Sequence, residues 1–437
     1  MVTVDQPIGM DAGGGESTLQ SKSVCVVGGG VAGLAVAREL RREGHAITVM
    51  EQSGDIGEQW LYDPRTDIED PLGARARVRV PSSIYACLRL ISPREAMGFS
   101  DFQFFPGDRR AMTRAACRLN TRVLRVGPML TSTMMIRQWT VRSVRRLSTT
   151  EDDDVVQEEE EEVFDVVVVA TGQYSQLMLP SDIEGMAEWT RRQLHSHLFR
   201  TLEPFLDEAV VVVGSEATAA TLAMSRMLAN HGDMLRLHSR IRRLHADGRV
   251  EFVDGSSVVA DTVIYCTGYT YSFPFLDTAV AVTIDSNGYV VSLLFEHVFP
   301  LSLAPSLAPS LSFVGVVRKV LIPWFFEVAA RWIAEAVGVA RKHTHNITGI
   351  EFQKMYEFGD KYSDLAPLEE WKKELLMSSI ASMMADVETF RDRAYDDCKI
   401  VRKGLRGWLA LATQAQAKSM AVVVDVEADV QTMANFF

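Results

Sequence analysis

The residues best suited to chemistry form a glycine-rich turn near the N-terminus. Three glycines follow the spacing Gly28-x-Gly30-x-x-Gly33, and an acidic residue, Glu51, comes eighteen residues after the third. In a dinucleotide-binding turn, the first glycine permits the tight turn, the second lets a pyrophosphate approach the backbone, and the third lets helix and strand pack closely. The acid accepts hydrogen bonds from ribose hydroxyls, which suits FAD or NAD better than NADP. The turn therefore predicts an adenine-dinucleotide site.

The segments around this turn are those that such a site needs. Residues 24–27 are apolar and predict a short buried strand, residues 34–42 have helical spacing, and residues 46–50 predict a second strand that delivers Glu51. This order places the partial positive charge of a helix N-terminus against the phosphates. The alternative is a glycine-rich turn that binds no ligand.

Two patterns occur twice along the chain. An apolar run that starts with aspartate and ends in Thr-Gly is found at residues 165–172 and again, with identical spacing, at residues 261–268. An apolar run that leads into a glycine occurs at residues 24–28 and at residues 210–214. Both repeats predict two related nucleotide-binding units. Asp-Gly pairs at 247–248 and 254–255 predict the tight turns of a β-meander.

Further motifs make the chain similar to a known family. Residues 57–60 read GEQW and residues 92–102 read SPREAMGFSDF, and residues 358–362 read FGDKY. Together with the glycine turn and the two Thr-Gly motifs, they resemble the flavin-containing monooxygenases, in particular the plant branch called glucosinolate S-oxygenase-like. The resemblance covers nearly the whole chain. Trp60 could pack on a flavin or fill the core.

The resemblance implies an α/β protein with two Rossmann-like dinucleotide-binding domains. The FAD-binding domain would be discontinuous, the NADP-binding domain inserted and shortened, and the C-terminal region mostly helical. The expected parts are a flexible N-terminal segment (1–22), the first part of the FAD-binding domain (23–190), the NADP-binding domain (191–262), the second part of the FAD-binding domain (263–330) and the helical C-terminal region (331–437).

The resemblance also implies a reaction. NADPH would reduce FAD, the reduced flavin would trap O2 as a C4a-hydroperoxide, and one oxygen would pass to a thioether sulfur or an amine nitrogen. The flavin carries this chemistry and the protein holds it, excludes water and positions the nicotinamide, so no catalytic side chain is assigned. The residues expected to bind the cofactors are Gly28, Gly29, Gly30, Val31, Ala32, Gly33, Glu51, Gln59, Trp60, Thr171, Gly172, Gly214, Ser215, Glu216, Ala217, Thr218, Ala219, Thr267 and Gly268.

The second glycine turn departs from the family pattern G-x-G/S-x-S-G. Ala219 in place of the last glycine adds a methyl group where helix and strand should meet, and Glu216 puts a carboxylate where phosphates should lie. Both changes oppose NADP binding, because like charges repel and the added methyl needs room. The alternative hypothesis is therefore a catalytically impaired flavin-binding relic with a degenerate NADP site.

The identifying motif of the family, F-x-G-x-x-x-H-x-x-x-[Y/F], also differs here. The chain keeps His195 and the final aromatic Phe199 but has Arg191 in place of the glycine. We expect His195 to organise the link between the nucleotide domains and not to act as an acid or base. Ile91 stands where many members have an asparagine near the flavin.

Arg240 has two interpretations. By spacing alone it could end a strand and contact the 2′-phosphate of NADP, whereas by resemblance its segment leads into a later strand, just before the 247–248 turn. We favour the second interpretation.

Composition excludes several classes of function. Of the net charge of −12, nine negative charges lie in residues 151–162, and removing them leaves −3. We expect this run to be a solvated, extended loop. No basic stripe remains for nucleic acid. The five cysteines contain no C-x-x-C, which argues against a disulfide reductase and a metal site and favours a reducing, cytoplasmic location. No apolar stretch is long enough to span a membrane.

Overall fold

The structure is a computed structural model that describes most of the chain between residues 21 and 385. The described residues are 21–66, 69–73, 80–86, 88, 92, 96–101, 117–130, 136–147, 156–174, 176–214, 236, 238–277, 282–286, 288, 290–292, 294–303, 308–317, 322–335 and 368–385. Residues 1–20 of the expected N-terminal segment, Ile91, the 358–362 motif and much of the C-terminal region lie outside them.

A parallel five-stranded sheet forms the centre of the first unit, in the order β20-β7-β1-β2-β3. Its strands are rich in valine, which suits a pleated surface covered on both faces. Their bounds are β1 Ser23–Val27, β2 Ala46–Met50, β3 Cys117–Arg118, β7 Val166–Val169 and β20 Leu311–Phe313. The strands predicted at residues 24–27 and 46–50 are confirmed.

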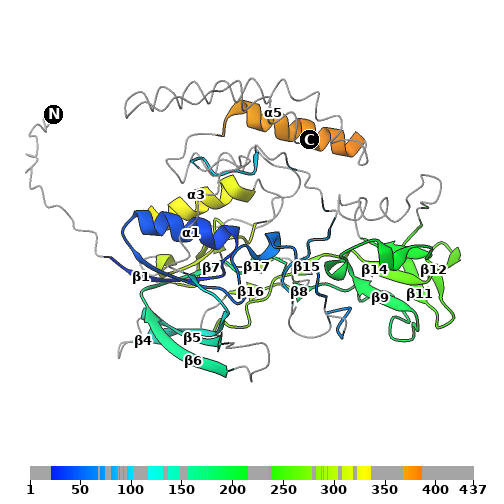
Figure 1. The fold of residues 1–437 in the computed structure, drawn as a ribbon, viewed down its shortest axis with the longest axis horizontal. Coiled ribbons are helices and arrows are strands. Elements are labelled where there is room, and N and C mark those ends of the chain that lie inside the picture. Colours follow the sequence, from blue (N-terminus) through cyan, green and yellow to red (C-terminus); the bar gives the residue numbers. More distant parts are fainter. Residues whose placement is uncertain are drawn as a thin grey trace, which may run out of the picture.

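Helices cover one face of this sheet (Figure 1). Helix α1 spans Val31–Arg42, α3 spans Ile322–Glu335 and α5 spans Glu370–Ala385. The buried faces of α1 and α3 share one apolar core with the sheet, and Leu376 of α5 belongs to the same core. Helix α3 begins at Ile322, before the start of the helical C-terminal region expected from residue 331, and has Pro323 in its first turn, where a missing N–H costs nothing.

An antiparallel sheet covers the opposite face and corrects one prediction. It consists of β4 Thr121–Leu130, β5 Ile136–Leu147 and β6 Val156–Phe164. The acidic run 158–162, expected to be a loop, lies within β6. Arg145 stands opposite Glu158 and Arg142 opposite Glu161. These cross-strand cations offset the self-repulsion of the run, so it pairs as a strand. Residues 151–155 lie outside the described residues.

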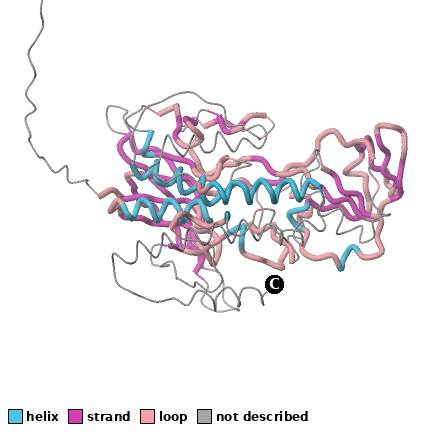
Figure 2. The backbone as a smooth tube through the Cα atoms, turned by 90° about the horizontal axis from the view of Figure 1, so that it is seen from above, coloured by secondary structure: helices cyan, strands magenta, loops and turns pink. Residues whose placement is uncertain are grey.

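A second unit lies at the other end of the molecule. Strands β9 Arg192–His195, β10 Val210–Val213 and β14 Thr262–Tyr265 form a parallel sheet in the order β10-β14-β9. Beside it, β11 Ile241–Leu244, β12 Arg249–Phe252 and β13 Ser257–Val259 form the predicted meander. In the view from above, strands occupy both ends of the molecule and loops join the two groups (Figure 2).

The sequence repeat corresponds to a structural repeat. Strand β7 pairs in parallel with β1, and β14 pairs in parallel with β10. In each unit the aspartate that starts the repeated pattern accepts a hydrogen bond from a backbone N–H at the start of the partner strand. Asp165 accepts from Ser23 at 2.8 Å, and Asp261 accepts from Ala209 at 3.0 Å. The predicted repeat is therefore present as two units with the same strand pairing, and nucleotide binding by each unit stays a prediction.

Short elements complete the described part. The strand pairs are β8 Gln176–Leu177 with β15 Tyr269–Thr270, β16 Thr283–Ile284 with β17 Val291–Ser292, and β18 Leu294–Phe295 with β19 Phe299–Pro300. The 3-10 turns are η1 Glu58–Trp60, η4 Ser196–Leu198, η5 Glu203–Phe205 and η6 Ala308–Ser310. The β8–β15 pair matters most for the site, because β8 follows β7 and β15 follows β14. It therefore joins the two units.

Candidate dinucleotide site

The first glycine turn lies between β1 and α1 and depends on the absence of side chains. Gly28 has a φ of +110°, and a Cβ there would lie 2.5 Å from the Ala170 carbonyl oxygen. A Cβ on Gly33 would lie 2.0 Å from the carbonyl oxygen of Gly28. Gly30 is the N-cap of α1, and neither a capping side chain nor an acid in the first turn occupies the helix N-terminus. The turn thus presents backbone N–H groups at the positive end of a helix.

Glu51 faces this turn. It follows β2 directly, is buried with 2 % of its surface exposed, and its Oε2 atom accepts a hydrogen bond from the N–H of Gly29 at 2.6 Å. Its Oε1 atom accepts from the N–H of Ser53 at 2.8 Å. The carboxylate is therefore held beside the glycine turn, as the sequence predicts for a ribose-binding acid.

The carboxyl end of β7 adds polar atoms at the same edge of the sheet. The N–H of Ala170 donates to the Val27 carbonyl at 2.9 Å, so the ladder between β1 and β7 continues to the turn. Beyond it, the Oγ1 atom of Thr171 and the Oε1 atom of Gln173 are buried and have no hydrogen-bond partner among the described residues. Buried polar atoms without partners are costly. Their position just after β7, the strand that pairs with β1 beside the glycine turn, fits a polar ligand such as a flavin dinucleotide.

Gln173 was not among the residues predicted from the sequence. Its signal is weak, since a polar residue directly after a Thr-Gly turn usually lies at the surface. Burial of its side chain, with 7 % exposed, distinguishes it.

The turn η1 is attached to the glycine turn. The N–H of Gly57 donates to the carbonyl of Gly29 at 3.0 Å. The side-chain amide of Gln59 donates to Ser83 Oγ at 2.8 Å. Trp60 is 39 % exposed. Of the two interpretations of Trp60, filling the core is therefore wrong.

The equivalent turn of the second unit is described only in part. Gly214 follows β10 and is exposed, whereas residues 215–219 lie outside the described residues. At the end of β14, the Thr267 hydroxyl donates to the Met178 carbonyl at 2.5 Å, and Gly268 has a φ of +86°. Unlike Thr171, Thr267 thus uses its hydroxyl to hold the chain near β8.

His195 occupies the junction between the units. It is buried at the end of β9, its Nδ1 atom accepts from the N–H of His197 at 3.1 Å, and its Nε2 atom lies 3.0 Å from the Gly268 carbonyl. Burial lowers the pKa of His195 to about 4. The ring is neutral at pH 7 and donates from Nε2 to Gly268. This geometry agrees with the linking role that the motif implies.

Arg191, which replaces the family glycine, has a structural role. Its guanidinium donates to the Ala260 carbonyl at 2.8 Å, to Asp261 Oδ1 at 3.0 Å and to the Asp247 carbonyl at 3.1 Å. It occupies the space beside Gly248, where a Cβ would lie 2.2 Å from the Arg191 Cζ atom. The substitution therefore fastens the meander to β14.

Arg240 leads into β11 of the meander, as the resemblance implies, and not from a strand of the parallel sheet. Its side chain is 82 % exposed and lies 3.7 Å from Asp182.

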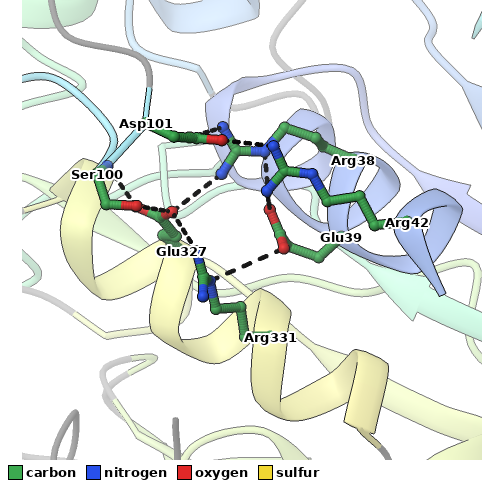
Figure 3. A network of polar contacts seen from close by, with 7 residues as sticks. All are labelled: Arg38, Glu39, Arg42, Ser100, Asp101, Glu327 and Arg331. Carbon is green, nitrogen blue, oxygen red and sulfur yellow. Dashed lines mark hydrogen bonds and ion pairs between the residues drawn. The ribbon is translucent and has the colours of Figure 1, made fainter. Parts of the chain in front are cut away.

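A balanced ion network holds the outer face of α1 (Figure 3). Glu327 of α3 is fully buried and accepts hydrogen bonds from the N–H of Ser100 at 2.7 Å and from Arg38 at 3.1 Å. Arg38 also reaches Asp101 at 2.9 Å. The full set comprises Arg38, Glu39, Arg42, Ser100, Asp101, Glu327 and Arg331. The network ties part of the 92–102 motif to the helix that begins at the glycine turn.

Replacing Glu327 by glutamine should destabilise the protein. The change removes the negative charge that faces the guanidinium groups of Arg38 and Arg331. Removing one partner of a buried ion pair lowers the free energy of unfolding by about 3 kcal/mol. Urea unfolding monitored by circular dichroism measures this loss. The matched control is Asp101→Asn, since the Asp101 side chain is 41 % exposed and exposed pairs contribute about 1 kcal/mol or less. Equal losses for both variants would contradict this account of the network.

Several kinds of site are absent from the described part of the chain. No group of three or more His, Cys, Asp or Glu residues there could hold a metal ion. The three cysteines described, Cys25, Cys117 and Cys266, are free thiols. None of the described helices combines the length and apolar character that a membrane crossing requires.

Comparison with known proteins gives consistent results. The family model for flavin-binding monooxygenase-like proteins matches residues 21–238 and 231–351. A flavin-containing monooxygenase of Arabidopsis thaliana, FMO GS-OX-like 8, is 40% identical over 462 residues, covering 89% of this chain and 95% of the relative. A second Arabidopsis thaliana relative, FMO GS-OX3, is 32% identical, covering 87% and 93% of the two chains.

Solved structures show the same similarity. The structure of S-allyl-L-cysteine S-oxygenase from Allium sativum has a TM-score of 0.73 and 31% identity, covering 89% of this chain and 99% of the other. Tmm from a Pelagibacter strain has a TM-score of 0.62 at 20% identity, covering 84% and 92% of the two chains, and so shares the fold.

Proposed function

The chain belongs to the flavin-binding monooxygenase-like family, and from this membership we propose that it uses FAD and NADPH to transfer one oxygen atom of O2 to a soft nucleophile. The nucleophile would be a thioether sulfur or an amine nitrogen. The observation that carries the proposal is Glu51, held beside the glycine turn at the N-terminus of α1.

The described residues have distinct roles in this proposal. The N–H of Gly28 donates to the Met50 carbonyl and that of Gly29 to Glu51, so these two glycines would shape the turn. The N–H groups from Gly30 to Gly33 would contact the pyrophosphate, and Glu51 would accept hydrogen bonds from ribose hydroxyls. Thr171 and Gln173 supply the partnerless buried oxygens at the end of β7, so they would contact polar groups of the flavin, with Gly172 beside them. Gln59 and Trp60 lie on the η1 turn, which is bonded to Gly29 through Gly57.

The second unit would take NADPH at Gly214 and residues 215–219, and Thr267 and Gly268 would be further contacts. The domain division proposed from the sequence assigns residues 191–262 to this binding. We also propose a cytoplasmic location, which the free thiols favour.

The bound flavin would supply the oxygen chemistry, and the chain would supply position and exclusion of water. The overall reaction converts a thioether, O2, NADPH and a proton into a sulfoxide, NADP+ and water. No titrating side chain has to act as a base, because the sulfur lone pair is itself the nucleophile. The buried His195 is neutral and hydrogen-bonded to Gly268, which agrees with a reaction that needs no side-chain base.

Sulfur is the first acceptor to test, because one similar protein of known structure is an S-oxygenase of S-allyl-L-cysteine, an alkyl thioether. An amine acceptor is the second.

The test is NADPH oxidation by the purified, flavin-loaded protein, with and without a methyl thioether, together with chromatography of the product. We expect NADPH consumption to increase with the thioether and sulfoxide to form. A dithionite-reduced flavin control, without protein, measures the background reaction. Protein that binds flavin but leaves NADPH unoxidised would contradict the proposal and favour the catalytically impaired relic.

A further inference from the structure

Arg200 is a buried cation that joins three separate segments of the main chain. It lies two residues after the turn η4, and 6 % of its surface is exposed. Its Nε atom donates to the Asp63 carbonyl at 2.6 Å, and its Nη2 atom donates to the Ser82 carbonyl at 2.7 Å. Its Nη1 atom donates to the carbonyls of His197 at 2.6 Å and Phe199 at 3.1 Å. The planar guanidinium therefore fixes the backbone at several points at once.

Two of these segments border η1, the turn that is bonded to the glycine turn. Asp63 comes three residues after the end of η1. Ser82 donates from its Oγ atom to the Gln59 carbonyl at 3.4 Å, and the Gln59 amide donates to Ser83 Oγ at 2.8 Å. Arg200 thus holds η1 from two sides, through the chain that follows it and through the segment packed beside it.

The third segment continues from β9, a strand of the second unit. It makes two further hydrogen bonds to residues 80–86. His197 donates from Nε2 to the Val80 carbonyl at 2.7 Å, because a carbonyl only accepts. The Arg200 carbonyl accepts from the N–H of Ala86 at 2.8 Å. The segment 80–86 is therefore held at three points by residues that follow β9, and it connects the second unit to η1.

We propose that Arg200 is a positioning residue for hydride transfer, which holds η1 and residues 80–86 against the end of β9 and so fixes NADPH in the second unit relative to FAD at the glycine turn. The inference rests on the function proposed above. In this step the hydride leaves NADPH, which becomes NADP+, and converts FAD into its reduced anion.

This role predicts a difference between binding and reaction. A misplacement of about 1 Å between reacting groups can lower a rate by about 100-fold. FAD binding, in contrast, depends on the glycine turn and Glu51, which Arg200 does not contact. Loss of Arg200 should therefore slow reduction of the flavin far more than it weakens affinity for FAD.

The test is anaerobic stopped-flow reduction of the FAD-loaded protein by saturating NADPH. In Arg200→Ala we expect the rate constant of flavin reduction to fall by about 100-fold and the Kd for FAD to rise by no more than about threefold. Arg200→Lys keeps the charge but has no planar fork to reach carbonyls on three segments, so it should also be reduced slowly.

Guanidinium ion provides a second measurement on Arg200→Ala. Below the concentrations that unfold the protein, it can occupy the vacated site and donate to the same carbonyls. It should raise the rate of flavin reduction by about tenfold, whereas sodium chloride at equal ionic strength should not. Arg200→Lys, whose side chain fills the site, should show no such rescue.

The matched control is Arg192→Ala. Arg192 lies on β9, and it donates to Thr262 Oγ1 and to the Pro204 carbonyl at 2.8 Å each. Neither acceptor belongs to η1 or to residues 80–86. Flavin reduction in this variant should therefore proceed at the wild-type rate.

The outcomes separate the inference from the proposed function. A wild-type rate in Arg200→Ala or in Arg200→Lys would overturn the inference alone, and so would a loss of FAD affinity as large as the loss of rate, or a rate that guanidinium leaves unchanged. Failure of both variants to fold would assign Arg200 to stability and overturn the inference as well. Wild-type protein that binds FAD but is not reduced by NADPH would overturn the proposed function and the inference with it.

Discussion

Replacement of Gly33 by alanine is expected to raise the Kd for FAD by about 100-fold, the equivalent of about 3 kcal/mol of steric strain. The added Cβ would lie 2.0 Å from the Gly28 carbonyl oxygen. Backbone atoms cannot yield by rotating, so α1 must move away from the glycine turn and the N–H groups lose their arrangement.

The sign of this prediction is informative. Glycine to alanine inside a helix normally stabilises it by up to about 1 kcal/mol, and Gly33 lies within α1. Thermal denaturation of Gly33→Ala should show a lower melting temperature, and a fluorescence titration with FAD should show weaker binding. The control is Gly54→Ala, where the nearest atom to an added Cβ, Asn120 Oδ1, is 3.4 Å away. Wild-type affinity in Gly33→Ala would show that the turn does not form the dinucleotide site.

Replacement of Glu51 by glutamine is expected to weaken FAD binding by about thirtyfold, or about 2 kcal/mol, the value of a hydrogen bond to a charged group. Both carboxylate oxygens accept backbone N–H groups, from Gly29 at 2.6 Å and from Ser53 at 2.8 Å. An amide provides one oxygen, and its NH2 group would oppose one of these donors. The side chain must then turn away from the glycine turn and the ribose.

The control for this variant is Glu43→Gln. Glu43 is exposed at the C-cap of α1, at the far end of the helix from the glycine turn. Its charge should not affect the Kd for FAD. Isothermal titration of both apoproteins with FAD measures the difference, and equal affinities would remove Glu51 from the proposed site.

The sequence predicted the first unit well because its causes are local. The short valine-rich strand, the glycine spacing and the position of Glu51 are all set within about 30 residues. The repeated Thr-Gly motifs likewise predicted two related units, and the structure has the same pairing in both, β7 with β1 and β14 with β10.

The errors and omissions have long-range causes. The acidic run 158–162 forms a strand because arginines at positions 118, 142 and 145 compensate its charge, and these partners become visible only when the sheet is paired. Gln173 stands out only through its burial.

The central claim is that the glycine turn and Glu51 bind FAD, and equilibrium titration of the wild-type apoprotein with FAD tests it most directly. Quenching of flavin fluorescence should saturate at one FAD per chain, and the complex should keep its flavin through gel filtration. A folded apoprotein that leaves the fluorescence of added FAD unchanged would contradict the claim.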